Sequence, residues 1–151
     1  MLSESARMSS AAEARFRLPA PATVARTITI SALDPAADDV VARLAEGRWT
    51  RARFFPSSAV AARAPRVLDE IAGADLAVMV ATAGADASAA AAIGAVCSDR
   101  RVHTATFVVR AAAVSDAVLS RTLGQVRPWS LMVVIANDDT YVEDMLRSFR
   151  T

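Results

Sequence analysis

Few residues of this chain have side chains that could form or break bonds. Cys97 and His103 are its only cysteine and its only histidine. A thiol beside an imidazole is the pair that a cysteine nucleophile needs. The pattern, however, places Cys97 in a helix and His103 at the start of the next strand, with no third group nearby to orient the ring. We interpret Cys97 as a small buried hydrophobic residue, and we expect no metal site, because one Cys and one His make no ligand set.

The carboxylates are the other candidates for chemistry. Asp34 and Asp138 each follow a predicted strand, and on neighbouring strands they could bind a divalent cation. Acidic clusters in phosphoacceptor domains do this with a Lys opposite the acids, but all 17 basic residues of this chain are Arg. Each acid also stands where a helix begins, and Asp is a good helix N-cap. We therefore interpret Asp34 as the cap of a helix that starts at Pro35, and Asp138 or Asp139 as the cap of the last helix.

Strand-like and helix-like segments alternate from Thr23 onward, and they would position these acids. Apolar or alternating runs predict strands over Val24–Ala32, Arg51–Phe55, Asp75–Thr82, Val102–Arg110 and Ser130–Ala136. Helical spacing predicts helices over 35–46, Arg63–Ala72, Ala85–Ser98, Val114–Leu123 and Asp139–Arg150. The alternate charges of the second strand favour a sheet edge, whereas the last three strands are apolar enough to be covered on both faces. Pro56-Ser57-Ser58 reads as a turn. The order predicts an α/β fold: a three-layer α/β/α Rossmann-like domain with a mainly parallel sheet of about five strands.

Length and composition limit the class of protein. The 151 residues suit one domain, which we place at 23–151 after a flexible N-terminal leader over 1–22 that ends in Pro19-Ala20-Pro21. The net charge of +1 provides no field for nucleic acid or an anionic membrane. The longest apolar run, Leu76–Ala83, is too short to cross a bilayer. We expect a cytoplasmic protein that binds neither nucleic acid nor membrane.

Ligands of a parallel sheet bind beyond the carboxyl ends of its strands. A phosphate there needs a glycine-rich loop at a helix N-terminus, but Ser31-Ala32-Leu33-Asp34 contains no Gly, and the third loop keeps only Gly84. Asp38 and Asp39 add negative charge where a pyrophosphate would lie. The polar strand ends could instead form a pocket for a neutral or cationic small molecule. Its hypothetical residues are Ser57, Ser58, Thr82, Gly84, Ser88, Asn137 and Asp138.

The segments over 70–145 follow one another in an order that is also found in a known protein family. A helix ends in Gly73-Ala74-Asp75, the next strand ends in Thr82-Ala83-Gly84, an Ala-rich helix and two strands follow, and Asn137-Asp138 begins the last helix. This order resembles the nucleotide-binding domain of the tubulin/FtsZ superfamily. The resemblance implies that Asp138 corresponds to the acid that contacts the guanine base.

The departures from that family concern the phosphate loops. Its glycine-rich signature loop is replaced here by Ala85-Asp86-Ala87-Ser88-Ala89-Ala90, and its glycine-rich first loop is missing. The chain also stops at the helix that in the family leads to a second domain, which supplies catalytic residues to a neighbouring subunit. The resemblance thus implies a degenerate member that keeps the fold and has lost the GTPase activity.

We therefore expect a non-catalytic domain without a cofactor, which acts as a protein-interaction or self-association module. Trp49, Phe54 and Phe55 are candidates for such a contact, unless they pack under the leader and the neighbouring helix. The alternative is a small-molecule or nucleotide-binding domain that uses the strand ends. A flavodoxin-like or response-regulator-like signalling domain shares the topology, but the missing Lys and the lack of hydroxyl-rich flavin loops count against it.

Overall fold

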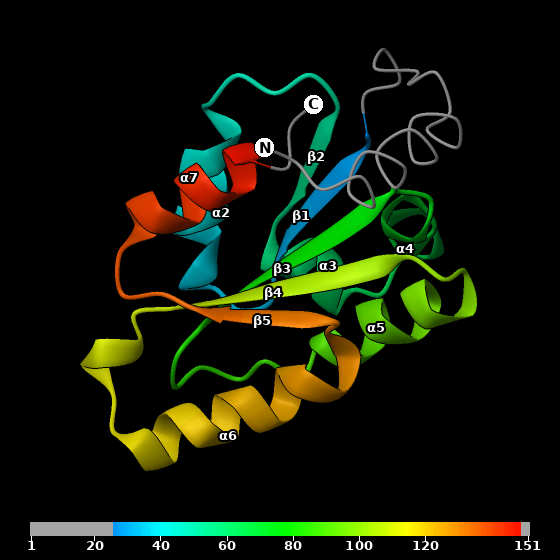
Figure 1. The fold of residues 1–151 in the computed structure, drawn as a ribbon. Helices are drawn as coiled ribbons and strands as arrows, with labels where there is room; N and C mark the ends of the chain where they lie inside the picture. Colours follow the sequence, from blue (N-terminus) through cyan, green and yellow to red (C-terminus); the bar gives the residue numbers. More distant parts are fainter. Residues whose placement is uncertain (1–25, 149–151) are drawn as a thin grey trace, which may run out of the picture.

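The computed structural model describes residues 26–148, in which five strands alternate with helices (Figure 1). In chain order the elements are β1 (Ile28–Ala32), α2 (Ala37–Ala45), β2 (Ala52–Phe55), α3 (Ser57–Ala61), α4 (Pro65–Ala72), β3 (Leu76–Thr82), α5 (Ala90–Asp99), β4 (His103–Val109), the 3₁₀ turn η1 (Ala111–Ala113), α6 (Asp116–Val126), the 3₁₀ turn η2 (Arg127–Trp129), β5 (Met132–Ile135) and α7 (Asp139–Ser148). The predicted leader over 1–22 lies outside the described residues.

All five strands are parallel, in the order β2-β1-β3-β4-β5. The chain runs from β1 to β2 on one side and then returns to place β3 on the other side of β1. This is the doubly wound order of flavodoxin and CheY, in which the reversal between β1 and β3 opens a crevice at the carboxyl ends of the strands. The predicted three-layer α/β Rossmann-like domain is therefore confirmed.

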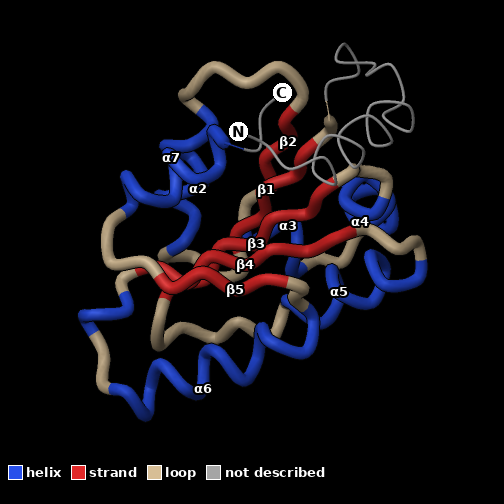
Figure 2. The backbone as a smooth tube through the Cα atoms, in the orientation of Figure 1, coloured by secondary structure: helices blue, strands red, loops and turns tan. Residues whose placement is uncertain are grey.

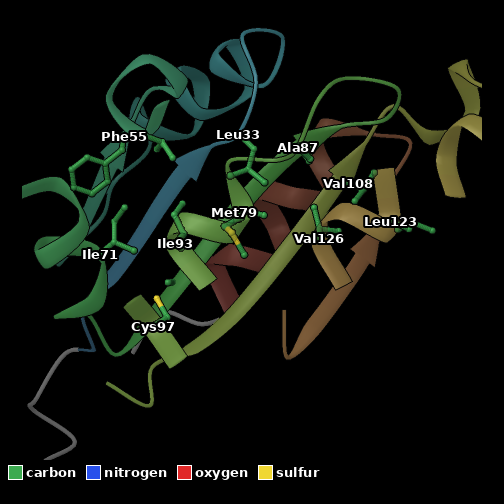
Figure 3. Close-up of a cluster of buried hydrophobic side chains, with 14 of the residues drawn as sticks. Leu33, Phe55, Ile71, Met79, Ala87, Ile93, Cys97, Val108, Leu123 and Val126 are labelled. Atoms are coloured by element: carbon green, nitrogen blue, oxygen red, sulfur yellow. The ribbon is translucent and has the colours of Figure 1, made fainter. Parts of the chain in front are cut away.

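Helices cover both faces of the sheet, and each layer has its own core (Figure 2). On one face α2 and α7 pack on the sheet through Val40, Leu44, Val142 and Leu146. On the other face the helices α3 to α6 pack on it, and this cluster is drawn in Figure 3. Its central side chain is Met79 of β3, which is fully buried. Alternation of side chains along β3 supplies both cores, because successive residues of a strand point to opposite faces.

The two edge strands differ from each other. The prediction that the second strand lies near an edge is confirmed, since β2 ends the sheet. The prediction that the last strand is buried on both faces is wrong, because β5 ends the sheet on the other side and its side chains are half-buried or exposed. Its apolar composition is that of a buried strand, and composition alone cannot tell a covered strand from an uncovered one.

Smaller local predictions also needed correction. Pro56-Ser57-Ser58 does not form a simple turn, because Ser57 begins the short helix α3. The helix predicted from Ala85 begins at Ala90, and the residues before it form the loop after β3. Among the described residues, no helix is long and apolar enough to cross a membrane.

The aromatic residues near β2 pack internally. Phe55 is buried, and the rings of Trp49 and Phe54 meet edge to face with centroids 5.7 Å apart. The Trp49 Nε1 group donates a hydrogen bond of 2.6 Å to the carbonyl of Leu44 in α2. The structure therefore supports packing against the neighbouring helix: Phe55 is buried, and Trp49 and Phe54 are half-buried against the core that α2 shares.

Candidate functional site

The carboxylate of Asp34 lies at the carboxyl ends of β1 and β3, where the strand order reverses. This side chain is 2% exposed. Its Oδ2 atom accepts a hydrogen bond of 2.7 Å from the backbone N–H of Thr82, and its Oδ1 atom accepts one of 2.9 Å from Ala37, the first residue of α2. The prediction that Asp34 is the N-cap of a helix starting at Pro35 is wrong, because α2 begins two residues later, at Ala37, and its N-cap is Ala36. Asp34 instead closes the turn before α2 and ties the ends of β1 and β3 together. An anion of the protein itself occupies the place where open sheets bind their ligands.

The loop after β2 is organised in the same way by Asp38. Its Oδ1 atom accepts from the Ser57 N–H at 2.7 Å, and its Oδ2 atom accepts from the Ser57 hydroxyl at 2.8 Å. Ser57 is the first residue of α3, so its N–H is one of the helix-end donors that have no partner within the helix. The sequence suggested that Asp38 would repel a phosphate. In the structure, its carboxylate accepts the hydrogen bonds that Ser57 could otherwise donate to an anion.

The loop after β3 is closed by side chains of α6. Gly84 has a φ of 90°, which an L side chain rarely adopts, and its N–H donates to Thr122 Oγ1 at 2.9 Å. The Ala87 N–H donates to Gln125 Oε1 at 2.8 Å. The sequence reading missed Thr122 and Gln125, and the only signal for them is that two polar residues share the inward side of a helix.

Asp86 completes the same loop. Its Oδ1 atom accepts from the Ser88 N–H at 2.9 Å and from the Gln125 side-chain amide at 3.2 Å. These hydrogen bonds, led by that of the Ser88 backbone, lower the pKa of the Asp86 carboxyl below its ordinary value. The loop after β3 therefore holds a carboxylate that is stabilised in its charged form.

An open hollow of about 440 Å³ lies between this loop and α6. Its lining consists of Gly84, Ala85, Asp86, Val118, Arg121, Thr122 and Gln125. Asp86 and Arg121 place opposite charges on its wall. The hollow could accommodate a small ligand that carries both charges or none, but the Gly84 and Ala87 N–H groups beside it already have partners.

The polar residues after β5 also serve the chain itself. Asn137 Oδ1 accepts from the Ala112 N–H of η1 at 2.8 Å. Asp138 Oδ1 accepts from the Thr140 N–H at 2.9 Å, so the prediction that Asp138 caps the last helix is confirmed. Asp34 and Asp138 do not follow neighbouring strands, because β3 and β4 separate β1 from β5. Within residues 26–148, no group of three or more acidic, His or Cys side chains could hold a metal ion.

The predicted pocket residues therefore fall into separate places. Thr82, Gly84 and Ser88 lie together on β3 and the loop after it, whereas Asn137 and Asp138 follow β5, beyond the intervening β4. Of these five residues, Gly84 lines the hollow between the loop and α6. The Thr82 hydroxyl is buried and has no hydrogen-bond partner, and the same holds for the hydroxyls of Thr29 and Ser31 in β1.

Cys97 and His103 do not form a catalytic pair. Cys97 of α5 is fully buried in the cluster of Figure 3, and burial raises the pKa of its thiol to about 11. A nucleophilic cysteine needs a lowered pKa instead. His103 is exposed at the start of β4.

Comparisons with known proteins show a similarity in fold and no similarity to a known family. No protein-family model matches the chain, and no curated protein matches it. Among solved structures, it is similar to translation elongation factor SelB from Methanococcus maripaludis in complex with the GTP analogue GppNHp, with a TM-score of 0.52 and 11% identity. The match covers 82% of this chain and 33% of SelB, so the chain spans about a third of that protein. An identity this low shows the fold alone.

Proposed function

We propose that this domain is a non-catalytic protein-interaction or self-association module that has no phosphate-binding site. The single observation that supports the missing phosphate site is the hydrogen bond from the Thr82 N–H to the Asp34 carboxylate. It places the chain's own negative charge at the carboxyl ends of β1 and β3, where the strand order reverses.

Displacing these internal acceptors would be unfavourable. A phosphate that reached Thr82 or Ser57 would have to replace Asp34 or Asp38, which would leave a carboxylate without its donors, beside another anion. A hydrogen bond to a charged group contributes about 1.5–3 kcal/mol, and leaving a buried charge unpaired costs more. The loop after β3 adds a third carboxylate, Asp86, to the same edge of the sheet.

The proposed interaction or self-association role is supported by a different feature, a group of exposed apolar side chains. The large apolar side chains that are exposed in the described residues gather around β5: Trp129, Leu131, Met132, Ile135 and Tyr141. Contiguous exposed apolar side chains mark sites of interaction more often than scattered ones do.

The second candidate function is small-molecule binding at the carboxyl ends of the strands. The hollow lined by Asp86 and Arg121 and the unpartnered Thr82 hydroxyl favour it. SelB, which shares the fold, was solved with a GTP analogue. The kinship with the tubulin/FtsZ superfamily stays a prediction from the sequence.

Thermal unfolding with GTP, GDP, ATP and flavin nucleotides at millimolar concentration, with and without Mg²⁺, tests the proposal. A ligand that binds the native state must raise the midpoint, and we expect no rise. A saturable rise with GTP and Mg²⁺ would contradict the missing phosphate site. A rise that Arg121→Ala abolishes and Arg66→Ala preserves would favour the second candidate, because Arg121 lines the hollow and Arg66 lies on an exposed helix surface.

A further inference from the structure

The exposed apolar residues surround one strand that has only one neighbour. Leu131 is 72% exposed and Ile135 is 47% exposed. β5 pairs with β4 and ends the sheet, and no strand of the described residues lies beyond it. The stretch Ser130–Ala136 contains no charged residue. An uncharged, apolar edge strand is a template for pairing with another chain.

The backbone of β5 has donors and acceptors available on its outer side. Ala136 donates its N–H to the Val108 carbonyl of β4 at 2.9 Å. Successive residues of a strand alternate in direction, so the peptide groups of Val133 and Ile135 point away from β4. β5 is the outermost strand on this side of the sheet in Figure 1. The direction of the Ala136 bond and the alternation along the strand therefore leave the N–H and C=O groups of these two residues facing a further strand.

The opposite edge of the same sheet has the usual protection. β2 carries Arg53 on an exposed position, two residues after the exposed Arg51, and Arg53 pairs with Glu70 at 3.5 Å. Charged side chains on an edge strand disfavour pairing with a second strand. Because one edge is protected and the other is not, β5 is the edge that is suited to a partner.

We infer that β5 pairs with β5 of a second copy of this chain, antiparallel across a two-fold axis, to form one continuous sheet. The inference rests on the proposed interaction role and names its partner. The charges beside the strand favour this arrangement: exposed Arg127 precedes β5, and exposed Asp138 follows it. An antiparallel pair brings the start of one strand beside the end of the other, so Arg127 of each copy lies near Asp138 of its partner. The uncharged strands between them bring no like charges together.

The exposed aromatic residues flank this edge on opposite faces of the sheet. Trp129 lies in the turn before β5 and packs on α5, whereas Tyr141 lies in the first turn of α7, which packs on the other face. A closed two-fold contact uses the same surface on both copies, so the pairing covers the outer edge of β5 in each copy.

The edge is held in place before any pairing. Thr104 Oγ1 donates to the Trp129 carbonyl at 2.8 Å, and the Ser130 hydroxyl donates to the Val126 carbonyl at 2.6 Å. The Thr106 and Ser130 hydroxyls lie within hydrogen-bond distance of each other, 2.6 Å apart. A rigid edge loses little conformational entropy when it binds, which favours association.

Sedimentation equilibrium of the wild type and of Ile135→Lys tests the pairing. We expect a wild-type dimer and at least about a tenfold rise in its dissociation constant for the variant, because a charge on an exposed residue of the edge strand opposes pairing. Ala42→Lys adds the same charge on the exposed surface of α2 and should leave the dimer unchanged. Circular dichroism confirms that both variants fold.

A charge pair tests the antiparallel direction. Arg127→Glu should weaken the dimer, because it places two carboxylates together, and adding Asp138→Asn should restore part of the affinity. Asn keeps an acceptor for the Thr140 N–H, so the cap of α7 is preserved. A strictly monomeric wild type, a dimer that Ile135→Lys leaves unchanged, or no recovery in the double variant would overturn the inference. None of these results bears on the phosphate site, which the nucleotide titration tests separately.

Discussion

The carboxylate of Asp34, at the end of β1, accepts a 2.7 Å hydrogen bond from the backbone N–H of Thr82, at the end of β3. This contact spans the point where the strand order reverses, which is where doubly wound sheets bind ligands. Asp38, Asp86, Thr122 and Gln125 satisfy the donors of the neighbouring loops in the same manner. The carboxyl edge of the sheet is therefore stabilised by groups of the chain itself.

Asp34→Asn should lower the free energy of unfolding by about 2–4 kcal/mol, because it replaces a buried charged acceptor of two N–H groups with an amide that can accept only on one side. Urea denaturation measures the change. Asp39→Asn, an exposed position in the first turn of the same helix, should change stability by less than about 0.5 kcal/mol. Equal effects of the two substitutions would show that the carboxylate bridge contributes nothing.

Gly94→Ala should destabilise the fold by about 1–3 kcal/mol through overpacking. A Cβ atom at this position of α5 would lie 2.4 Å from Cβ of Trp129, so the turn before β5 must shift. Gly124→Ala is the matched control, since nothing lies within 4 Å of its added Cβ in α6. Higher helix propensity should raise the stability of that variant by up to about 1 kcal/mol. A Gly94→Ala protein as stable as wild type would contradict the packing of α5 on η2.

Gln125→Ala should loosen the loop after β3, because it removes the acceptor of the Ala87 N–H and a donor to Asp86. Hydrogen exchange should accelerate at Ala87. The pKa of Asp86 should rise toward its ordinary value but stay below it, since the Ser88 hydrogen bonds remain. Ser120→Ala, at an exposed position of the same helix, serves as control. Unchanged exchange at Ala87 in Gln125→Ala would exclude the proposed tether.

Cys97 should react with thiol reagents only when the protein unfolds, because it is fully buried and its pKa is raised to about 11. The folded thiol keeps its proton to higher pH than the unfolded thiol, whose pKa is near 9.0. Its contribution to stability is therefore complete below about pH 9 and is lost as the pH rises toward 11. The free energy of unfolding of wild type and of Cys97→Ala, each measured as a function of pH, gives this contribution as their difference. Rapid labelling of the native protein would contradict the assignment.

The sequence predicts the architecture better than it predicts the site. Alternating apolar and helical segments indicate the parallel sheet, and the charges of Arg51 and Arg53 correctly indicate an edge. The exposure of β5 could not be predicted, because Ser130–Ala136 has the composition of a covered strand, and only the strand order shows that no strand of the described chain pairs with its outer edge.

For the loops at the strand ends, the sequence predicts that glycine is missing and that acids are present. It does not predict which groups those acids contact. Asp34 and Asp38 were expected to repel a phosphate, and their partners, Thr82 and Ser57, lie 48 and 19 positions away along the chain. Contacts at such separations depend on the strand order, which short-range patterns do not encode. Thr122 and Gln125 went unnoticed for the same reason, because their function appears only when α6 packs beside the loop after β3.

The central claim is that the donors at the carboxyl edge of the sheet are already occupied and bind no phosphate. Amide-resolved NMR during a titration with GTP and Mg²⁺ tests it most directly, with attention to the backbone N–H groups of Ser57, Thr82, Gly84 and Ala87. The account predicts no saturable shift of these four signals at millimolar nucleotide. A saturable shift of the Thr82 amide together with its neighbours would contradict it.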